Sequence, residues 1–289
     1  MRAKGGGRKH NTLARYVSAL KLPLSFALNI QIRGVISDYF LRGVFLKNPS
    51  ARARAMPEWD LNVLLRFLNS EEFEPLENAS FLRVSQKALV LIFLASGRRT
   101  IDLVNMSRIS FYHEVPGRLT IKWVESFRAK NERRSFTPEN PSIAELVLNG
   151  IANPLCPVRA FKFYLKASKA EIHRRKLTLK YLWVPLKGNR PINELALANL
   201  FKSVVDEANR SAGFLERVSI SPHQMRKLSA AYSFWADQEP EVIRLRMGFS
   251  AFSVLLQHYV ADVPDLEVPC VLPGGLAFPI GFLPSEGAV

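Results

Sequence analysis

Residues 94–103 read LASGRRTIDL, and in this stretch a long apolar segment gives way to two consecutive arginines. The segment that leads into it, residues 81–94, is strongly apolar and is predicted to be the central core helix of the fold. Gly97 is typical of a helix end, because glycine readily adopts the left-handed conformation that closes a last turn. Taken alone, Arg98 and Arg99 could simply be cations favoured by the helix dipole.

Helical spacing of apolar residues recurs on both sides of this stretch. Helices are predicted over residues 11–21, 34–46, 59–68, 81–94, 157–167, 193–209, 222–236, 239–247 and 250–261. Short strands are predicted at residues 109–113, 119–125 and 132–137, with a turn at Pro116–Gly117 between the first two. The expected fold is therefore mainly α-helical, with one small three-stranded antiparallel sheet.

The chain has one clear candidate for a domain boundary. Residues 49–57 read PSARARAMP, a basic connector bounded by prolines. Residues 1–55 are expected to be a basic leader and a helical domain whose beginning is missing, because two or three helices form too small a core to be stable alone. Residues 56–265 are expected to form the main domain, and residues 266–289 a tail rich in Pro and Gly without periodicity.

The net charge is the most informative bulk property. Forty Lys and Arg against 25 Asp and Glu give a net charge of +15. Residues 1–55 alone hold 11 basic residues and one acid, Asp38. A polyanion is the natural partner of such a chain, because each neutralised phosphate releases condensed counterions. We expect the DNA-contacting cations to include Arg2, Lys4, Arg8, Lys9, Arg15, Arg52, Arg54, Arg128, Arg133 and Arg134.

Other partners and settings are less favoured. The longest apolar stretch, residues 88–95, is too short to cross a bilayer, and the basic residues do not line one face of a long amphipathic helix, so no membrane partner is expected. No secretory signal opens the chain. Cys156 and Cys270 lie far apart without metal-ligand spacing, which favours a reduced intracellular setting.

Five short stretches could carry chemistry. They are residues 94–103, 127–134 (FRAKNERR), 221–226 (SPHQMR), 247–249 (MGF) and 257–259 (QHY). Ser221 and Pro222 are typical of a helix start, and the helix they open would present His223 and Arg226 one turn apart. Each stretch alone is common in a chain this rich in arginine, so the order of the five along the chain carries the argument.

In that order the stretches resemble the tyrosine recombinase (phage integrase) family. The family signature is Arg, Lys, His-x-x-Arg, His or Trp, and then Tyr. The matching positions are Arg99, Lys130, His223, Arg226, Phe249 and Tyr259, with Asp102 on the acidic position that follows the first arginine. The resemblance covers roughly residues 57–262 and implies an α+β tyrosine recombinase catalytic domain, preceded by part of a helical core-binding domain.

Three further stretches resemble recombinases of eukaryotic mobile elements, the DIRS-like and Crypton-like groups. They are residues 59–61 (WDL), 73–76 (FEPL) and 155–160 (LCPVRA). This resemblance implies a nuclear protein if the source is eukaryotic, and a cytoplasmic protein bound to DNA otherwise. The resemblance to the tyrosine recombinase family also implies a homotetramer on paired sites in double-stranded DNA.

The resemblance implies a specific chemistry. Tyr259 would attack a DNA phosphodiester and form a 3′-phosphotyrosyl link. Arg99 and Arg226 would clamp the non-bridging oxygens, because a guanidinium pairs with phosphate in two places and stays protonated. Lys130 would protonate the departing 5′ oxygen, and His223 would assist proton transfer. Neither a metal nor ATP is implied.

The match to the family leaves some assignments open. Phe249 stands where the family has His or Trp, and it can pack against the site but cannot donate a hydrogen bond. Lys122 and Arg128 are alternatives to Lys130 as the general acid. His258 is expected to point about 100° away from its neighbour on a helix. Asp102 is expected to orient an arginine or to cap the next helix.

Two functions remain in competition. The first is an active recombinase or integrase of a mobile element that cleaves and rejoins DNA. The second is a non-enzymatic DNA-binding protein, a decayed or domesticated copy that keeps the basic clamp. A type IB topoisomerase would share the chemistry of the first.

Overall fold

The computed structural model describes residue 20 and residues 60–130, 132, 137–214, 220–249 and 263–279. The chain divides into two compact units, Met1–Pro57 and Glu58–Val289. Leu20 is helical, and the rest of the predicted helices at residues 11–21 and 34–46, together with the one at 250–261, lies outside the described residues. No helix in the part of the chain that the structure describes combines the length and apolar character needed to cross a membrane.

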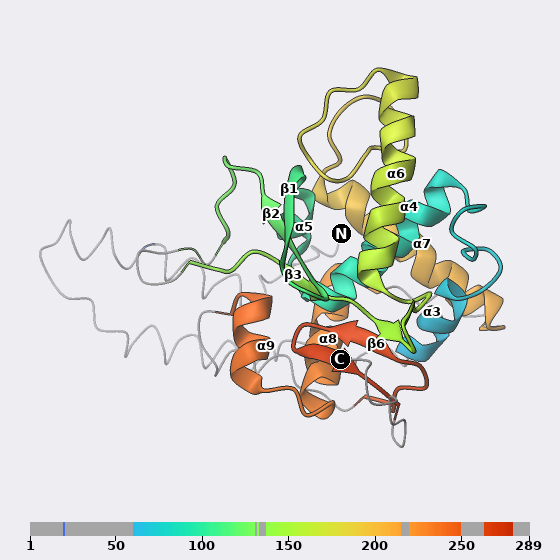
Figure 1. Cartoon of the computed structure of the whole chain (residues 1–289), viewed down its shortest axis with the longest axis vertical. Helices are drawn as coiled ribbons and strands as arrows, with labels where there is room; N and C mark the ends of the chain where they lie inside the picture. Colours follow the sequence, from blue (N-terminus) through green and yellow to red (C-terminus); the bar gives the residue numbers. More distant parts are fainter. Residues whose placement is uncertain are drawn as a thin grey trace, which may run out of the picture. The chain divides into compact units, whose positions relative to one another are not determined.

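Helices make up most of the regular secondary structure of the second unit (Figure 1). They are α3 (Leu61–Leu68), α4 (Phe81–Ser96), α5 (Thr100–Val104), α6 (Pro157–Arg175), α7 (Glu194–Ser211), α8 (Pro222–Trp235) and α9 (Pro240–Met247). Every helix predicted within the described ranges is present. The structure adds the short helix α5, and it extends α6 by eight residues beyond position 167, because the apolar periodicity stops there although the exposed, charged end of the helix continues.

A small antiparallel sheet packs beside these helices. Its strands are β1 (Met106–Val115), β2 (Arg118–Trp123) and β3 (Ser142–Ala144), in the order β1-β2-β3. The fold class predicted from the sequence is confirmed. The position of the third strand was wrong: residues 132 and 137 are not strand, and residues 133–136 lie outside the described part. The strand forms instead where Ile143, which is buried, pairs with Leu119 of β2.

The core is built around α4, as the sequence predicts. Every side chain from Val84 to Ser96 is buried. In Figure 1 this helix runs through the middle of the unit, and α6, α7 and α8 all contact it. A helix that is buried on all sides carries little amphipathic pattern, which explains why its sequence is apolar almost throughout.

The C-terminal stretch contains a hairpin that the sequence pattern does not reveal. Strands β6 (Cys270–Leu272) and β7 (Gly275–Ala277) pair antiparallel within the residues treated above as a tail without periodicity. Strand β6 contacts α4 and α8, and its three side chains are buried. Two strands of three residues each are too short to show alternation, and tertiary packing decides their structure. Two further short strands, β4 (Val147–Leu148) and β5 (Ile151–Ala152), form a separate hairpin.

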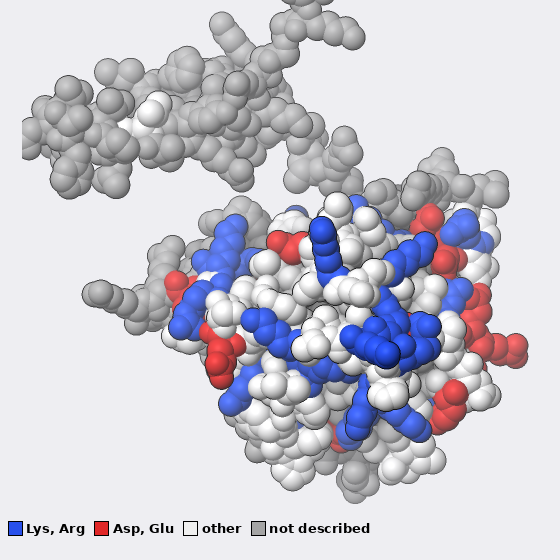
Figure 2. Space-filling view, turned by 90° about the horizontal axis from the view of Figure 1, so that it is seen from above, with Lys and Arg blue, Asp and Glu red and all other residues white. Residues whose placement is uncertain are grey.

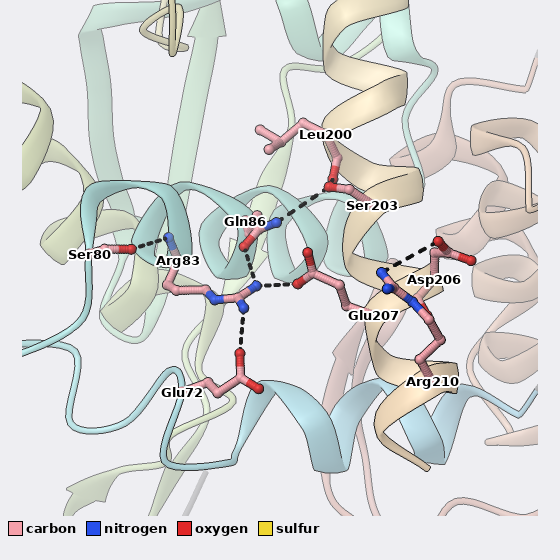
Figure 3. Close-up of polar contacts among 9 residues, drawn as sticks. All are labelled: Glu72, Ser80, Arg83, Gln86, Leu200, Ser203, Asp206, Glu207 and Arg210. Carbon is pink, nitrogen blue, oxygen red and sulfur yellow. Dashed lines mark hydrogen bonds and ion pairs between the residues drawn. The ribbon is translucent and has the colours of Figure 1, made fainter. Parts of the chain in front are cut away.

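A polar network ties α4 to α7 at the surface (Figure 3). Arg83 of α4 pairs with Glu72 in the segment before the helix and with Glu207 of α7. Gln86 accepts a hydrogen bond of 3.0 Å from Arg83 and donates one of 3.4 Å to Ser203 of α7. The charged groups are partly exposed, so these ion pairs contribute little to stability.

A second, buried network ties α4 to α6. Lys87 is fully buried, donates to the carbonyl oxygen of Leu68 at 2.7 Å and pairs with Glu74. Arg159 of α6 binds both carboxylate oxygens of Glu74, at 2.7 and 2.8 Å. Burial lowers the pKa of Lys87 to about 8, and the negative charge of Glu74 opposes this shift. The FEPL and LCPVRA stretches singled out in the sequence therefore meet in this network.

Candidate active site

One pocket gathers most of the residues predicted to be catalytic. It has a volume of about 480 Å³. Its walls come from the α4–α5 corner, the loop after β2 and the N-terminal ends of α7 and α8. The lining residues are Arg99, Thr100, Ile101, Phe127, Arg128, Lys130, Glu194, Pro222, His223 and Arg226. Four of the six residues predicted to be catalytic, Arg99, Lys130, His223 and Arg226, thus share one pocket although they are far apart in the sequence.

The α4–α5 corner places Arg99 at the pocket. Gly97 caps α4 with a left-handed φ of 54°, and Arg99 is the N-cap residue of α5. The backbone N–H of Arg99 donates to the carboxylate of Asp102 at 3.1 Å. Asp102 therefore caps the helix that Arg99 begins, which is one of the two roles expected for it, and it fixes the backbone from which Arg99 reaches the pocket.

The N-terminus of α8 places His223 and Arg226. Ser221 is the N-cap residue, its hydroxyl accepts from the backbone N–H of Gln224 at 3.3 Å, and the Gln224 side chain accepts from the Ser221 N–H at 2.7 Å. Pro222 follows in the first turn. This reciprocal cap confirms the helix start predicted from the sequence, and it presents His223 and Arg226 one turn apart on the pocket side.

The guanidinium of Arg226 is buried at the pocket and is held in place by its neighbours. The residue is 1% exposed. One terminal nitrogen donates to the carbonyl oxygen of Gly97 at 2.5 Å, and the other donates to that of Met247 at 2.9 Å. The guanidinium carbon lies 4.3 Å from the ring centroid of Phe249. Arg226 is thus fixed between the ends of α4 and α9 and covered by an aromatic ring.

Phe249 packs in the protein interior. Its ring is 1% exposed and follows the left-handed C-cap of α9 at Gly248, where φ is 70°. It packs on Arg226 and belongs to a buried cluster with Met247 and Ile243. Phe249 is not among the described residues that line the pocket. It therefore takes the packing role expected for an aromatic at this position.

Arg98 is a buried partner of the site that the sequence did not single out. It is 1% exposed, donates to the carbonyl oxygen of Glu139 and lies 5.3 Å from the ring centroid of Trp123 in β2. A Cβ added at Gly248 would collide with the guanidinium of Arg98. Burial lowers the pKa of Arg98 to about 9, and the negative charge of Asp102 opposes this shift. Nothing in two consecutive arginines indicates which one turns inward, so only the structure could reveal this role.

The structure narrows the choice of general acid. Lys130 and Arg128 both line the pocket, and Arg128 also lies 3.7 Å from the carboxylate of Glu132. Lys122 projects from β2 over the ring of Tyr112, 5.3 Å from its centroid, and is absent from the described lining residues. Of the three candidates for the general acid, Lys122 is therefore the one that does not line the pocket.

The remaining predicted residues lie outside the described part of the chain. They are Tyr259 with its neighbour His258, and the cations Arg2, Lys4, Arg8, Lys9, Arg15, Arg52, Arg54, Arg133 and Arg134. Their assignments stay predictions from the sequence.

Comparison with solved structures identifies the fold. The integrase of the transposon Tn1549, in complex with circular intermediate DNA, superposes with a TM-score of 0.54 and 16% sequence identity, covering 90% of this chain and 78% of that one. The same integrase in complex with transposon right end DNA gives a TM-score of 0.52 at 15% identity, with the same coverage. The chain has the tyrosine recombinase catalytic fold.

A weaker match covers less of the other chain. The XerH site-specific recombinase bound to difH substrate has a TM-score of 0.47 and 13% identity, covering 68% of this chain and 48% of that one. The chain thus spans about half the length of XerH. No protein-family model matches the sequence, and no curated protein matches it either.

The fold places His223 near positively charged side chains. Partial desolvation lowers the pKa of His223, and the positive charges of Arg226 and Lys227 lower it further. We expect an NMR titration of the free protein to give His223 a pKa below the usual histidine value of about 6.5. The change Lys227→Gln should raise that pKa, because it removes one of the repelling charges. A pKa at or above the usual value, or one unchanged in Lys227→Gln, would contradict this electrostatic account.

The same shift has a consequence for stability. Protonation of His223 is less favourable in the folded chain than in the unfolded one, because the folded-state pKa is the lower of the two. Its contribution to stability is complete above the unfolded-state pKa. The contribution is lost as the pH falls through the interval between the two pKa values, and it does not change further at lower pH.

Gly97 is a second testable position of the site. A Cβ at this left-handed residue would lie 2.6 Å from Cε of Met247 and 2.9 Å from Cγ of Pro273. We expect Gly97→Ala to lower the free energy of unfolding by about 1–3 kcal/mol through backbone strain, with a further loss from the collisions. Gly150→Ala is the control, since Gly150 has a φ of 75° and no atom within 4 Å of an added Cβ. Equal losses in urea denaturation would show that the collisions have no effect.

Proposed function

We propose that this chain cleaves and rejoins double-stranded DNA through a covalent 3′-phosphotyrosyl intermediate, with Tyr259 as the nucleophile. The observation that carries the proposal is the pocket in which Arg99, Lys130, His223 and Arg226 meet. These residue types, on a recombinase fold, suit an attack on a phosphodiester: two guanidiniums for the phosphoryl oxygens and two groups that can transfer protons.

The two arginines would stabilise the charge that builds up on the phosphoryl oxygens. The guanidinium of Arg226 is already fixed by two carbonyl oxygens and by the ring of Phe249. Such a preorganised cation needs no rearrangement during the reaction, which is the condition under which electrostatic stabilisation is strongest. Arg99 is partly buried, lines the same pocket and would complete the clamp.

The proton transfers would be carried out by residues on the exposed side of the pocket. The phenol oxygen of Tyr259 forms the new bond to phosphorus while the bond from phosphorus to the 5′ oxygen breaks. Lys130 would give its proton to the departing 5′ oxygen, and neutral His223 would assist removal of the phenolic proton. The phosphotyrosyl ester conserves the energy of the original bond, so attack by a 5′-hydroxyl reverses the reaction.

The finer assignments are part of the same proposal. The WDL, FEPL and LCPVRA stretches favour a recombinase of a eukaryotic DIRS-like or Crypton-like mobile element, acting in the nucleus as a homotetramer on paired DNA sites. One observation favours a second candidate, a DNA-binding protein that no longer turns over. Phe249 occupies a position at which the family offers a hydrogen-bond donor, and its ring offers none.

A covalent-capture experiment tests the proposal. The substrate is a library of nicked duplexes with randomised sequence, in which cleavage releases a short strand and so prevents religation. We expect the full chain to form an adduct with DNA that survives detergent, and Tyr259→Phe to form none. DNA binding without any adduct across the library would favour the second candidate. Equal adducts from both proteins would show that another residue is the nucleophile.

A further inference from the structure

The C-terminal half of α6 and the loop after it are strongly basic. Residues 166–190 contain eight Lys and Arg and a single acid, Glu171. Five of these cations are exposed and have neither an ion-pair partner nor a contact with an aromatic ring among the described residues. They are Lys166, Lys169, Lys176, Lys187 and Arg190, and we call them the α6 basic surface. None of them belongs to the pocket or was expected to contact DNA.

The other cations of the segment fix its shape. Arg174 pairs with Glu171 at 2.6 Å. Arg175 donates to the carbonyl oxygen of Pro185 at 2.5 Å and to that of Gly188, which holds the loop back against the end of α6. Residues 182–185, in the middle of the loop, are buried. The backbone that carries the exposed cations is therefore held in place. Little of this backbone needs to become ordered when an anion binds.

Figure 2 shows the face toward which the C-terminal end of α6 points in Figure 1. Lys and Arg side chains gather there, and Asp and Glu lie toward the margins. Like charges brought together in this way repel one another, and a bound polyanion relieves the repulsion. A surface of this kind suits a regular row of phosphates.

The loop that carries part of this surface leads directly to a residue that lines the pocket. It ends at Asn193, the N-cap residue of α7, and Glu194 lines the pocket. Since an extended chain spans at most about 3.6 Å per residue, the Cα of Arg190 lies within about 14 Å of the Cα of Glu194, and that of Lys187 within about 25 Å. One turn of duplex DNA is about 34 Å long. A duplex with one phosphate in the pocket therefore extends far enough to reach Lys187 and Arg190 of this surface.

We infer that the α6 basic surface binds the backbone phosphates of the same duplex, within about one helical turn of the cleaved bond. This inference rests on the proposed function for its choice of partner. Contacts to phosphates position a protein on DNA without reading its sequence. The surface would thus hold the duplex in register over the pocket and add affinity that is sensitive to salt and independent of sequence.

The test compares two triple variants with the same loss of charge. The first is Lys176→Gln, Lys187→Gln and Arg190→Gln, in the α6 basic surface. The control is Arg66→Gln, Lys162→Gln and Arg210→Gln, exposed cations that each have a carboxylate partner in Glu267, Glu145 or Asp206. Affinity for a long duplex is measured over a range of salt concentrations, and unfolding midpoints verify that both variants are folded.

For the first variant we expect weaker binding to every duplex sequence, and a salt dependence that is shallower by up to about 0.9 in slope for each cation removed. The control should bind with the slope of the unaltered chain. Equal slopes for the two variants would overturn the inference. Adduct formation by the unaltered chain tests the proposed function separately, because a chain that forms no adduct can still show the difference in slope.

Discussion

Arg226→Lys is expected to slow strand cleavage by about 100- to 1000-fold, the typical cost of removing one preorganised donor from a transition state. Lysine keeps the positive charge but loses the planar fork. A single ammonium group cannot reproduce, in the same geometry, the two hydrogen bonds to the carbonyl oxygens of Gly97 and Met247 and the stacking on Phe249. The charge that faces the phosphate would therefore no longer be fixed in place.

Cleavage rates on the captured substrate, together with urea denaturation, provide the measurement. Arg210→Lys is the matched control, because Arg210 is an exposed residue of α7 paired with Asp206. The control should cleave at the rate of the unaltered chain. A folded Arg226→Lys protein that also cleaves at that rate would remove Arg226 from the proposed mechanism.

Glu74→Gln is expected to lower the free energy of unfolding by about 3–5 kcal/mol, the usual cost of breaking a buried ion pair from one side. The amide cannot neutralise Lys87, which is fully buried, or Arg159, whose two bonds to the carboxylate are 2.7 and 2.8 Å long. Since domains are stable by only about 5–15 kcal/mol, the variant should be close to unfolding.

Urea denaturation of Glu74→Gln and Glu72→Gln checks this expectation. Glu72 pairs with Arg83 in the exposed network of Figure 3, and its loss should cost about 1 kcal/mol or less. Adding Lys87→Met to Glu74→Gln should recover part of the stability, because it removes the unpaired buried charge. Equal losses in the two single variants, or no recovery, would show that the buried pair does not stabilise the fold in this way.

Sequence patterns predict those parts of the fold that local chemistry decides. The start of α8 follows from Ser221 and Pro222, whose capping and backbone preferences act within one turn. The core helix α4 follows from its apolar composition. The β6–β7 hairpin and the position of β3 do not follow, because their strands are three residues long and are held by contacts with α4, α8 and β2. No local pattern encodes such contacts.

The same distinction holds for the candidate site, because some of its features could be predicted from the sequence and others could not. The order of the motifs predicts which residues could act together, and the structure brings Arg99, Lys130, His223 and Arg226 into one pocket. The inward turn of Arg98 could not be predicted, because it depends on the approach of Gly248 and Trp123 from distant parts of the chain. The α6 basic surface was also missed, since it appears only once the loop folds back on the end of α6.

The most direct test of the central claim is to identify the residue that becomes linked to DNA. The captured adduct is digested with protease and nuclease, and the peptide that carries the residual nucleotide is sequenced by mass spectrometry. The proposed mechanism predicts a single modified peptide, with a 3′-phosphate ester on the phenol oxygen of Tyr259. A nucleotide on any other side chain, or an adduct that still forms with Tyr259→Phe, would contradict it.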